Sequence, residues 1–233
     1  FELDASIMEG KDLSAGAVAG LKHVKHPINA AYAVKTKSPH VMLSGAGAEE
    51  FAKEQGLEMV EDNMYFATPK TMEWIEKLKQ ESKKNGTVGC VVLDKQGNLT
   101  AGTSTGGMFK KRWGRIGDSP VIGAGTYADN NSCAVSCTGH GEYFIRHAVA
   151  FDVCARYKYL KESVEKAADY IIHTELNTNA GNGGLIAVDK LGNIAMPYNS
   201  GGMFRGFLYK EKGSPEIKKG CGIGKKIVVV GEK

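Results

Sequence analysis

The sequence predicts a mixed α and β fold whose strands form antiparallel hairpins rather than regular β-α-β units. Three observations support this fold class. One hairpin pattern occurs twice, helical segments with one-sided apolar stripes lie between the two copies, and no dinucleotide-type alternation of strand and helix is visible. With 233 residues, the chain is long enough for one domain, or two modest ones, with a substantial core.

The repeated hairpin emerges when the sequence is shifted by 95 positions, which places residues 89–109 on residues 184–204. The identical positions are Gly89/Gly184, Asp94/Asp189, Lys95/Lys190, Gly97/Gly192, Asn98/Asn193, Gly106/Gly201, Gly107/Gly202, Met108/Met203 and Phe109/Phe204. Chance would give about one or two identities in such a window. Each copy has an apolar run, a turn rich in Asp, Gly and Asn, and a second run, which is typical of a β-hairpin. We therefore predict two related hairpins in pseudo-symmetric halves of a sheet system.

Helices are predicted mainly between the two hairpin copies. A first helix over residues 142–160 places apolar side chains on one face, and a second carries a stripe with helical spacing. The first face consists of Ile145, Val149 and Val153, and the stripe of Val164, Ala167, Ala168, Ile171 and Ile172. Residues 48–55 are a further short helix. Residues 71–85 are helix-prone but increasingly polar, which favours a surface linker.

Composition excludes several classes of protein. The net charge is only +4, and no basic run is interleaved with aromatic residues, which argues against a nucleic-acid partner. No apolar stretch approaches the length of about 18 residues that a membrane span needs. Five cysteines, an odd number in a chain of this size, favour reduced thiols and a cytoplasmic location. Because the sequence starts at Phe1 and not at Met, an export signal would not be visible in it.

Three segments have only a superficial likeness to ligand sites. Residues 220–226 (GCGIGKK) lack the first glycine and the hydroxyl residue of a phosphate loop, and residues 45–47 (GAG) lack the third glycine of a dinucleotide fingerprint. The latter segment favours a tight turn into a helix. Cys133, Cys137 and His140 lack a fourth metal ligand, and the spacing of the two cysteines predicts buried thiols on one face of a strand.

The first hairpin copy is surrounded by short segments rich in glycine and hydroxyl residues. Thr87 stands where the polar linker meets the first apolar strand, and Asn182 is its counterpart in the second copy. The segments that follow are TSTGGM (103–108), GRIGDSP (114–120), GAG (123–125) and TGHGE (138–142). Strand ends and turns explain such glycines, but close backbone N–H groups and small hydroxyls also suit an oxyanion or carboxylate pocket.

The charged residues of this region point the same way. Arg115 and Asp118 offer a charge pair three residues apart. The second hairpin copy has no counterpart of residues 114–120. This asymmetry places the predicted chemistry at the first copy, while the residues alone leave the turn and pocket interpretations about equally supported.

At these positions the sequence resembles the plant-type L-asparaginase/isoaspartyl peptidase family, N-terminal-nucleophile (Ntn) hydrolases with a threonine nucleophile. The motifs, which lie in family order and at family spacing, are GTVG (86–89), TSTGGM, GRIGDSP, GAGTYADN (123–130) and SCTGHGE (136–142). Upstream ELDA (2–5) and SPHVML (38–43) also match, as does GGLIA (183–187), and the resemblance weakens after about Tyr209. It implies a four-layer αββα sandwich in which helical layers cover two stacked antiparallel sheets.

The resemblance also implies a single domain over residues 1–233 that is cut in two. Residues 1–86 would be the C-terminal part of an α subunit, ending in a linker at residues 68–86, and residues 87–233 would be the β subunit. Autocatalytic cleavage between Gly86 and Thr87 would free Thr87 as the nucleophile. Its α-amine, with an ordinary pKa of about 8, could then act as the general base for its own hydroxyl.

Further roles carry over from the family to single residues of this chain. They are Arg115 for the substrate α-carboxylate, Asp118 for its α-ammonium group, Thr138 and Gly139 for the oxyanion, Gly141 for a further substrate contact, and Thr105 for orienting the nucleophile. The implied reaction is hydrolysis of the β-amide of L-asparagine and of β-aspartyl dipeptides through an aspartyl ester. The resemblance implies no cofactor and no metal ligand, since the sodium-binding loop of the family is absent here. It also implies a small-molecule substrate and a homodimer of α/β units.

Two departures from the family pattern carry expectations of their own. The sequence begins within the family's α subunit, so the first strand and the helices after it have no counterpart. We therefore expect an uncovered sheet edge, exposed apolar surface and a chain whose self-processing is open. In addition, Phe109, Lys110 and Lys111 stand where the family usually has Asn-Lys, with Trp113 close by, so the substrate loop should have a different shape.

Other functions remain open on the sequence. A glycosylasparaginase usually has Asp-Thr at its cleavage site, where Gly86-Thr87 stands here, and nothing suggests the long peptide-binding surface of an endopeptidase. A catalytically inactive or unprocessed fragment is the alternative from a different class. Ammonia release from asparagine separates that alternative from an enzyme, and a glycan-linked asparagine separates the two amidases.

Overall fold

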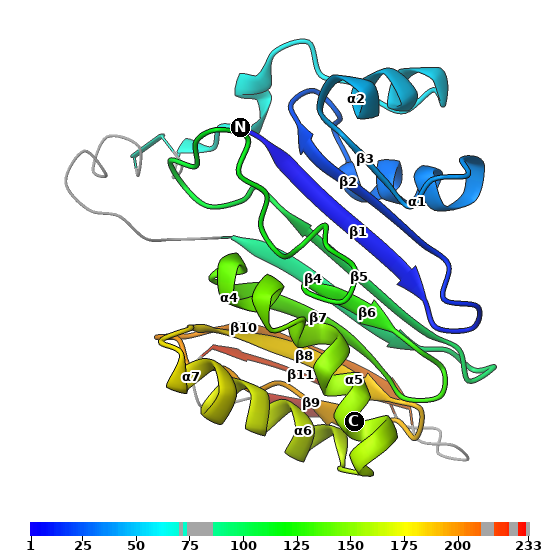
Figure 1. Cartoon of the computed structure of the whole chain (residues 1–233), viewed down its shortest axis with the longest axis vertical. Coiled ribbons are helices and arrows are strands. Elements are labelled where there is room, and N and C mark those ends of the chain that lie inside the picture. The colour runs from blue at the N-terminus through cyan, green and yellow to red at the C-terminus, as the bar shows by residue number, and fades with distance from the viewer. Residues whose placement is uncertain (70–71, 74–85, 211–216, 224–227, 232–233) are drawn as a thin grey trace.

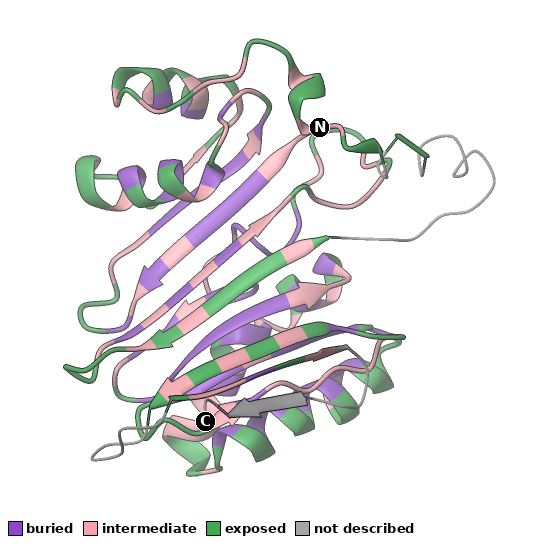
Figure 2. Cartoon of the chain, turned by 180° about the vertical axis from the view of Figure 1, so that it is seen from behind, coloured by how far each residue is buried: buried purple, intermediate pink, exposed green. Residues whose placement is uncertain are grey.

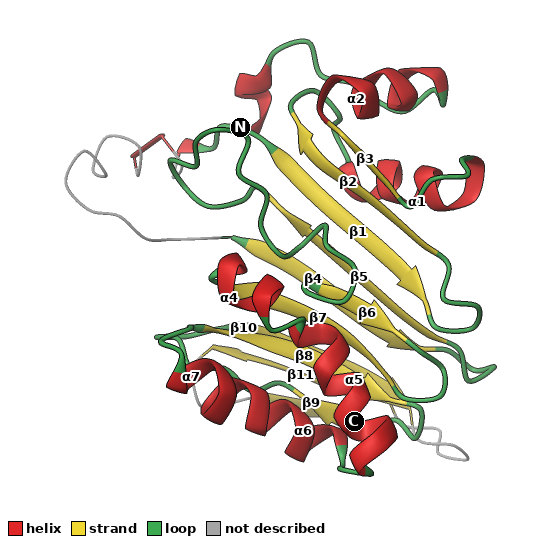
Figure 3. Ribbon diagram, viewed as in Figure 1, coloured by secondary structure: helices red, strands yellow, loops and turns green. Residues whose placement is uncertain are grey.

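A computed structural model describes residues 1–69, 72–73, 86–210, 217–223 and 228–231 of the chain (Figure 1). The strands in this part form three sheets, and helices lie against two of them (Figure 3). Most of the predicted linker, residues 68–86, falls outside the described residues, as does the end of the glycine-rich segment 220–226. Among the described helices, none is both long and apolar enough to cross a membrane.

The first sheet has five strands in the order β3-β2-β1-β5-β4. Its strands are β1 (Leu3–Glu9), β2 (Ala15–Leu21), β3 (Met42–Ser44), β4 (Thr87–Leu93) and β5 (Leu99–Thr105). Helices α1 (Pro27–Lys37) and α2 (Gly45–Glu54) pack on β1, β2 and β3. Pro27 suits the first turn of α1 because that turn has no use for its N–H group. A buried apolar cluster, which includes Val18, Leu21 and Val34, joins these helices to the sheet.

The second sheet has four strands in the order β6-β7-β8-β9. The strands are β6 (Thr126–Ala128), β7 (Cys133–Gly139), β8 (Gly183–Asp189) and β9 (Ile194–Ala195), and the helices that cover them are α5 (Val149–Leu160) and α6 (Val164–Tyr170). Cys133, Val135 and Cys137 of β7 are buried in the apolar cluster beneath these helices. The prediction of strand thiols on one buried face is therefore confirmed.

The two sheets lie face to face. Strands β1, β4 and β5 contact β6, β7 and β8, and the apolar residues between the sheets include Met8, Leu99 and Ala134. Contacts thus run from α1 and α2 through the five-stranded and four-stranded sheets to α5 and α6 (Figure 1). This bears out a mixed α and β fold with stacked sheets.

The sheets differ from the prediction in two details. In the described part of the chain, all strand pairs are antiparallel except β2 and β3, because α1 carries the chain back to the end of the sheet from which β2 began. A third sheet, in the order β10-β11-β12, also forms beside the other two. Its strands are β10 (Phe204–Lys210), β11 (Ile217–Ile223) and β12 (Val228–Gly231).

Both copies of the repeat form the predicted hairpin. The first is β4 with β5 and the second is β8 with β9, although β9 is only two residues long. Each turn is closed by the side chain of an aspartate. Asp94 Oδ1 accepts a hydrogen bond from the Asn98 N–H at 2.7 Å, and Asp189 Oδ1 accepts one from the Asn193 N–H at 2.9 Å. Four of the shared residues, Asp94, Lys95, Gly97 and Asn98 with their counterparts, therefore encode the same turn twice.

The helix predictions hold with one correction. The five stripe residues of the second helix are all fully buried, and α2 matches the helix predicted at residues 48–55. Residues 142–160, however, form two helices, α4 (Gly141–Arg146) and α5, instead of one. The chain turns at Ala148, whose φ of 46° is left-handed, so Ile145 is 38% exposed and does not share the buried face of Val149. After α6 follow a π-helical turn (Ile171–Glu175) and α7 (Leu176–Thr178).

Two strands with exposed residues lie at sheet edges. Within the described residues, β4 is the last strand of its sheet and β10 the last of another. Figure 2 shows exposed residues along both strands, and Val88 of β4 and Phe204 of β10 are 76% and 81% exposed. Thr87 and Gly89 of β4 and Phe204 of β10 are among the residues that line the pocket described next.

Candidate active site

A pocket of about 690 Å³ lies between the two hairpin copies. Residues at equivalent positions of the repeat line it in pairs, namely Thr87 with Asn182, Met108 with Met203 and Phe109 with Phe204. Sequence reasoning placed the chemistry at the first copy alone. The structure instead uses the second copy as the opposite wall, and the shift of 95 positions was the signal that could have predicted this.

Thr87 is the first residue of β4 and stands opposite Thr105, the last residue of β5. The Thr87 hydroxyl donates to Thr105 Oγ1 at 3.3 Å, and the Thr105 hydroxyl donates to the Gly86 carbonyl at 2.8 Å. Thr105 Oγ1 also accepts the N–H of Gly107 at 3.0 Å. One hydroxyl therefore contacts both residues of the Gly86-Thr87 peptide bond and also fixes the turn that follows β5.

Glycine at position 89 lets β4 lie directly on β7. A Cβ added there would overlap with the hydroxyl of Ser136. Ser136 belongs to a buried chain of hydroxyl groups between the two sheets, formed by Ser6, Thr126, Thr103 and Ser136 with oxygen separations of 2.5 to 2.7 Å. Sequence reasoning missed this chain because its members come from four different strands.

Thr138 and Gly139 lie at the end of β7 and line the same pocket as Thr87. Gly139 pairs with Gly183 of β8, and a Cβ on Gly139 would lie 2.5 Å from the Asn182 carbonyl oxygen and 2.8 Å from Gly183 Cα. The two strands can approach this closely only because both positions are glycine. The structure thus brings together Gly86, Thr87, Thr138 and Gly139 of the predicted set.

Arg115, Asp118 and Gly141 form a second group. A Cβ on Gly141 would lie 2.8 Å from Arg115 Nη2 and 3.0 Å from Asp118 Oδ1, so glycine leaves room for both side chains. The expected Arg115–Asp118 pair is not the contact observed. Arg115 instead binds the carboxylate of Glu142 with two hydrogen bonds of 2.9 and 3.0 Å. Glu142 comes within reach because it follows Gly141 in the first turn of α4.

Asp118 is the most perturbed acid of this group. It is 5% exposed, and its Oδ2 has no hydrogen-bond partner among the residues that the structure describes. Burial raises the pKa of Asp118 to about 7, against an ordinary value of 3.8; Arg115 lowers it, while Glu142 and Asp4 add to the rise. An unpaired buried carboxyl oxygen beside a guanidinium group is suited to a ligand that carries both a cation and an anion.

The segment 138–142 joins the two groups. Thr138, Gly139 and His140 line the pocket, and the next two residues contact Arg115 and Asp118. The loop that bears Arg115 also has the unusual residues noted in the sequence. Phe109 lines the pocket, whereas Trp113 points outward and is 96% exposed.

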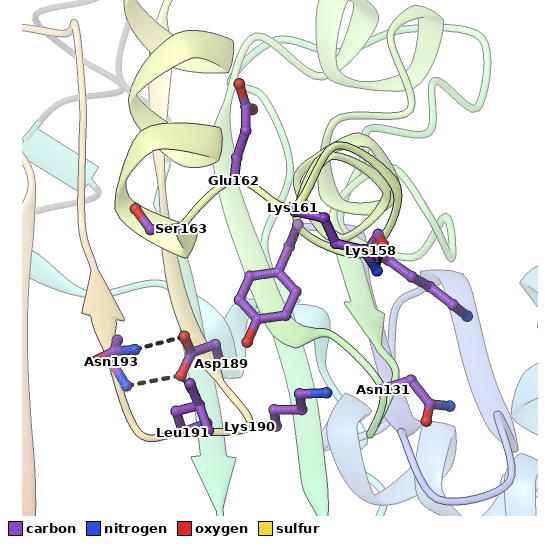
Figure 4. A pocket seen from close by; sticks show the side chains of 10 residues that line it. Asn131, Lys158, Lys161, Glu162, Ser163, Asp189, Lys190, Leu191 and Asn193 are labelled. Carbon is purple, nitrogen blue, oxygen red and sulfur yellow. Dashed lines mark hydrogen bonds between the residues drawn. The ribbon is translucent and has the colours of Figure 1, made fainter.

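A second pocket, of about 610 Å³, lies around the turn between β8 and β9 and the end of α5 (Figure 4). Several of its charged groups are already engaged within the chain. Asp189 accepts hydrogen bonds from Asn193, and Lys158 forms an ion pair with Asp129 at 2.9 Å. None of the predicted site residues lines it, so the first pocket is the candidate active site.

Comparison with known proteins identifies the family to which the chain is related. The sequence profile described as "Asparaginase" matches residues 1–217. The chain belongs to the asparaginase family. Three relatives are the isoaspartyl peptidase of Salmonella typhimurium (48% identical over 89% of this chain and 71% of the relative), the isoaspartyl peptidase of Escherichia coli (44%; 91% and 73%) and the human isoaspartyl peptidase/L-asparaginase (41%; 87% and 68%). The resemblance seen in the sequence, and the expectation of a hydrolase of this family, are confirmed.

Proposed function

We propose that this member of the asparaginase family hydrolyses the β-amide of L-asparagine and the β-aspartyl bond of isoaspartyl dipeptides, with Thr87 as an N-terminal nucleophile. The observation that carries the proposal is the Gly86-Thr87 bond, which is contacted on both sides by the Thr105 hydroxyl and lies in one pocket with Thr138 and Gly139. The names of the relatives supply the substrate class.

The first reaction is cleavage of the chain itself. The Thr87 hydroxyl attacks the Gly86 carbonyl carbon, and the hydroxyl of Thr105 donates to the carbonyl oxygen, where negative charge develops. The Gly86–Thr87 C–N bond then breaks, the hydroxyl proton ends on the leaving nitrogen, and Gly86 becomes an ester of Thr87. One water hydrolyses this ester and leaves the Gly86 carboxylate and a free α-amine on Thr87.

Turnover repeats this chemistry on a substrate. The Thr87 α-amine takes the proton of its own hydroxyl, which attacks the β-carbonyl carbon of the aspartyl group. Ammonia or the amine of a second amino acid leaves with that proton, and water then hydrolyses the aspartyl ester. The Thr138 hydroxyl and the backbone of Gly139 are placed in this proposal to stabilise the oxyanion, since both line the pocket with Thr87.

The second group of residues would select the substrate. The planar guanidinium of Arg115 suits the two oxygens of an α-carboxylate, and Glu142 already shows that it binds a carboxylate in this way. Asp118 would bind the α-ammonium group through Oδ2. Because burial raises its pKa to about 7, binding the cation requires loss of a proton from Asp118. A substrate without an α-amine would leave that buried acid unpaired.

Three further features belong to the same proposal. We infer the four-layer αββα fold of Ntn hydrolases, supported by helices that pack on the outer face of each stacked sheet. A cytoplasmic location is supported by cysteines that are all free among the described residues. A homodimer of processed units is the expectation from the family resemblance.

Intact mass and denaturing gels over several days at neutral pH test the proposal, with Thr87→Ala as the control. We expect two fragments that start at Phe1 and Thr87, absent in the variant, together with ammonia release from L-asparagine and cleavage of a β-aspartyl dipeptide. A chain that stays whole and hydrolyses neither substrate would establish the inactive-fragment alternative. Preference for glycan-linked asparagine would instead establish a glycosylasparaginase.

A further inference from the structure

Lys111 lies in the loop between β5 and Asp118 but does not point into solvent. Its side chain is only 8% exposed, although lysine is rarely buried unless it is paired. Its Nζ lies 3.5 Å from Glu2 Oε2 and 3.6 Å from Asp4 Oδ2, at the start of β1. The residue therefore fastens the substrate loop to the start of β1, the strand that pairs with β5, across more than 100 positions of sequence.

Asp4 is the group that most needs this cation. It is fully buried, and its Oδ1 accepts the Gly20 N–H at 2.8 Å, whereas its Oδ2 has no hydrogen-bond partner among the described residues. Burial raises the pKa of Asp4, and Lys111 opposes that rise. Without this nearby cation, keeping the buried Asp4 carboxylate ionised costs free energy of folding.

The lysine also supports both ends of its loop. Its stem runs against Gly107, where an added Cβ would lie 3.0 Å from Lys111 Nζ. Gly107 is the residue whose N–H holds the Thr105 hydroxyl. Four residues after Lys111 stands Arg115, whose charge acts on both Asp4 and Asp118. Lys111 is thus placed between the group that contacts Thr87 and the group assigned to the substrate's charges.

We propose that Lys111 is a positioning residue, which anchors the substrate loop on Glu2 and Asp4 and balances the Asp4 charge so that Asp118 stays available for a cationic group of the substrate. The proposal rests on the role of Asp118 given above. It predicts that Lys111 and Asp4 act on Asp118 in opposite directions, as a pair of compensating charges.

The charges that face Asp118 fix the expected signs. They are Arg115 from its own loop, Glu142 from α4 and Asp4 from β1, and the buried thiol of Cys137 faces it from β7. Loss of the Lys111 charge leaves Asp4 uncompensated, which raises the pKa of Asp118. Loss of the Asp4 charge lowers that pKa. Loss of both charges should bring it back to near the starting value.

The test is a double-mutant cycle in the full chain, with the single variants Lys111→Met and Asp4→Asn and the double variant that combines them. Lys111→Arg keeps the charge, and Lys110→Met is the matched control because Lys110 is exposed and adjacent. Carbon-13 NMR titration of the aspartate carboxyl groups, assigned with Asp118→Asn, reports on Asp118 without any need for activity. The pH profile of kcat/KM on a β-aspartyl dipeptide is the second measurement.

For Lys111→Met, we expect the titration of Asp118 and the acidic limb of kcat/KM to move up by about one pH unit, with kcat/KM falling about tenfold at pH 6. Asp4→Asn should move both downward. Three variants should stay near the wild type: the Lys111→Met/Asp4→Asn double variant, the Lys111→Arg variant and the Lys110→Met variant. If Lys111→Met does not fold while the double variant does, the balancing of Asp4 is supported directly.

Two results separate this proposal from the proposed function. Folded single variants in which the titration of Asp118 does not move would overturn the role of Lys111, whatever their activity. A wild-type chain that hydrolyses neither substrate, but in which Asp118 titrates with the expected shifts, would overturn the proposed function and keep the coupling between Lys111, Asp4 and Asp118.

Discussion

The two hairpin copies use one sequence pattern in two different environments. The first, β4 with β5, ends its sheet, and Val88 is 76% exposed. The second begins with β8, which lies between β7 and β9 and is buried along nearly its whole length. The turns are the same, so the difference comes from what surrounds them. The repeated hairpin supplies both walls of the pocket, and the proposed chemistry depends on Thr87 and on the loops outside the repeat.

The largest expected effect concerns Thr87, the residue by which the first hairpin copy differs from the second. Thr87→Ala should abolish self-cleavage and lower kcat/KM at least about 1,000-fold, because the hydroxyl is the proposed nucleophile. Asn182→Ala, at the equivalent position of the second copy, should cost less than about tenfold, since the pocket uses Asn182 as a wall. Ammonia release and gel analysis check both variants. Similar activity in the two would remove the proposed distinction between the copies.

A second test concerns residues 114–120, which only the first copy has. The pKa of Asp118 is about 7 in the folded chain, and the ionised form would bind the substrate's ammonium group. We therefore expect kcat/KM to fall about tenfold per pH unit below pH 7. Asp118→Asn should lose most activity and should not show that limb. A flat profile down to pH 5 would contradict the assignment.

The same carboxyl group predicts a pH dependence of stability. Its pKa is higher in the folded chain than its ordinary value of 3.8, so the folded state binds the extra proton. The contribution is fully present below pH 4 and is lost as the pH rises through about 7. Urea unfolding from pH 4 to 8 should show this decline in the wild type and a smaller decline in Asp118→Asn.

Replacing the equivalent glycines Gly89 and Gly184 by alanine should have an intermediate effect, on the free energy of unfolding. A Cβ on Gly184 would lie 2.6 to 2.8 Å from Tyr198 Cβ, Met203 Sδ and the Pro197 carbonyl oxygen, whereas one on Gly89 meets mainly the Ser136 side chain. The Pro197 carbonyl is backbone and Tyr198 Cβ is fixed to the backbone, and both yield less than a hydroxyl, so Gly184→Ala should lower the free energy of unfolding by about 1–3 kcal/mol and Gly89→Ala by less. Urea melts with unchanged m-values would measure this, and the reverse order would show that β4 is the more rigid strand.

The smallest effect lies in the turns. Asp189 is 1% exposed and accepts hydrogen bonds from Leu191, Asn193 and the Asn193 side chain, so Asp189→Ala should cost about 1–2 kcal/mol. Asp94 makes the matching bonds in solvent, and Asp94→Ala should cost less. Hydrogen bonds from Asn98 lower the pKa of Asp94, so its contribution should vanish as the pH falls below 4. Equal losses would mean that solvent exposure has no influence here.

Much of this could be predicted from local sequence. The repeat specified both hairpins and their turns, and the stripe at Val164 specified α6, because strand and helix periods are local signals. The thiols of β7 followed from alternation. Thr87, Thr138 and Gly139 could be assigned through the family motifs, and the pocket that they share was then found in the structure.

The remainder depends on contacts between distant segments. No local signal predicts the left-handed Ala148 that divides α4 from α5, because tertiary packing selects this conformation. Arg115 has Asp118 three residues away, yet it pairs with Glu142, which α4 brings back to it. The burial of Lys111 against β1 was likewise invisible, since it depends on the neighbourhood of β1 and the loop after β5.

The exposed edge of β4 has a consequence for handling the protein. Within the described residues, β4 ends its sheet and carries exposed residues along its length (Figure 2), so it is a template for edge-to-edge pairing with the same strand of another molecule. Val88 and Val92 of this strand are exposed apolar side chains. Copies of the chain should therefore associate through β4 at high protein concentration. Val92→Lys would place a charge on this edge away from Thr87, and it should keep preparations clear without a change in turnover. Self-association through β4 should therefore affect purification of the protein before its activity is assayed.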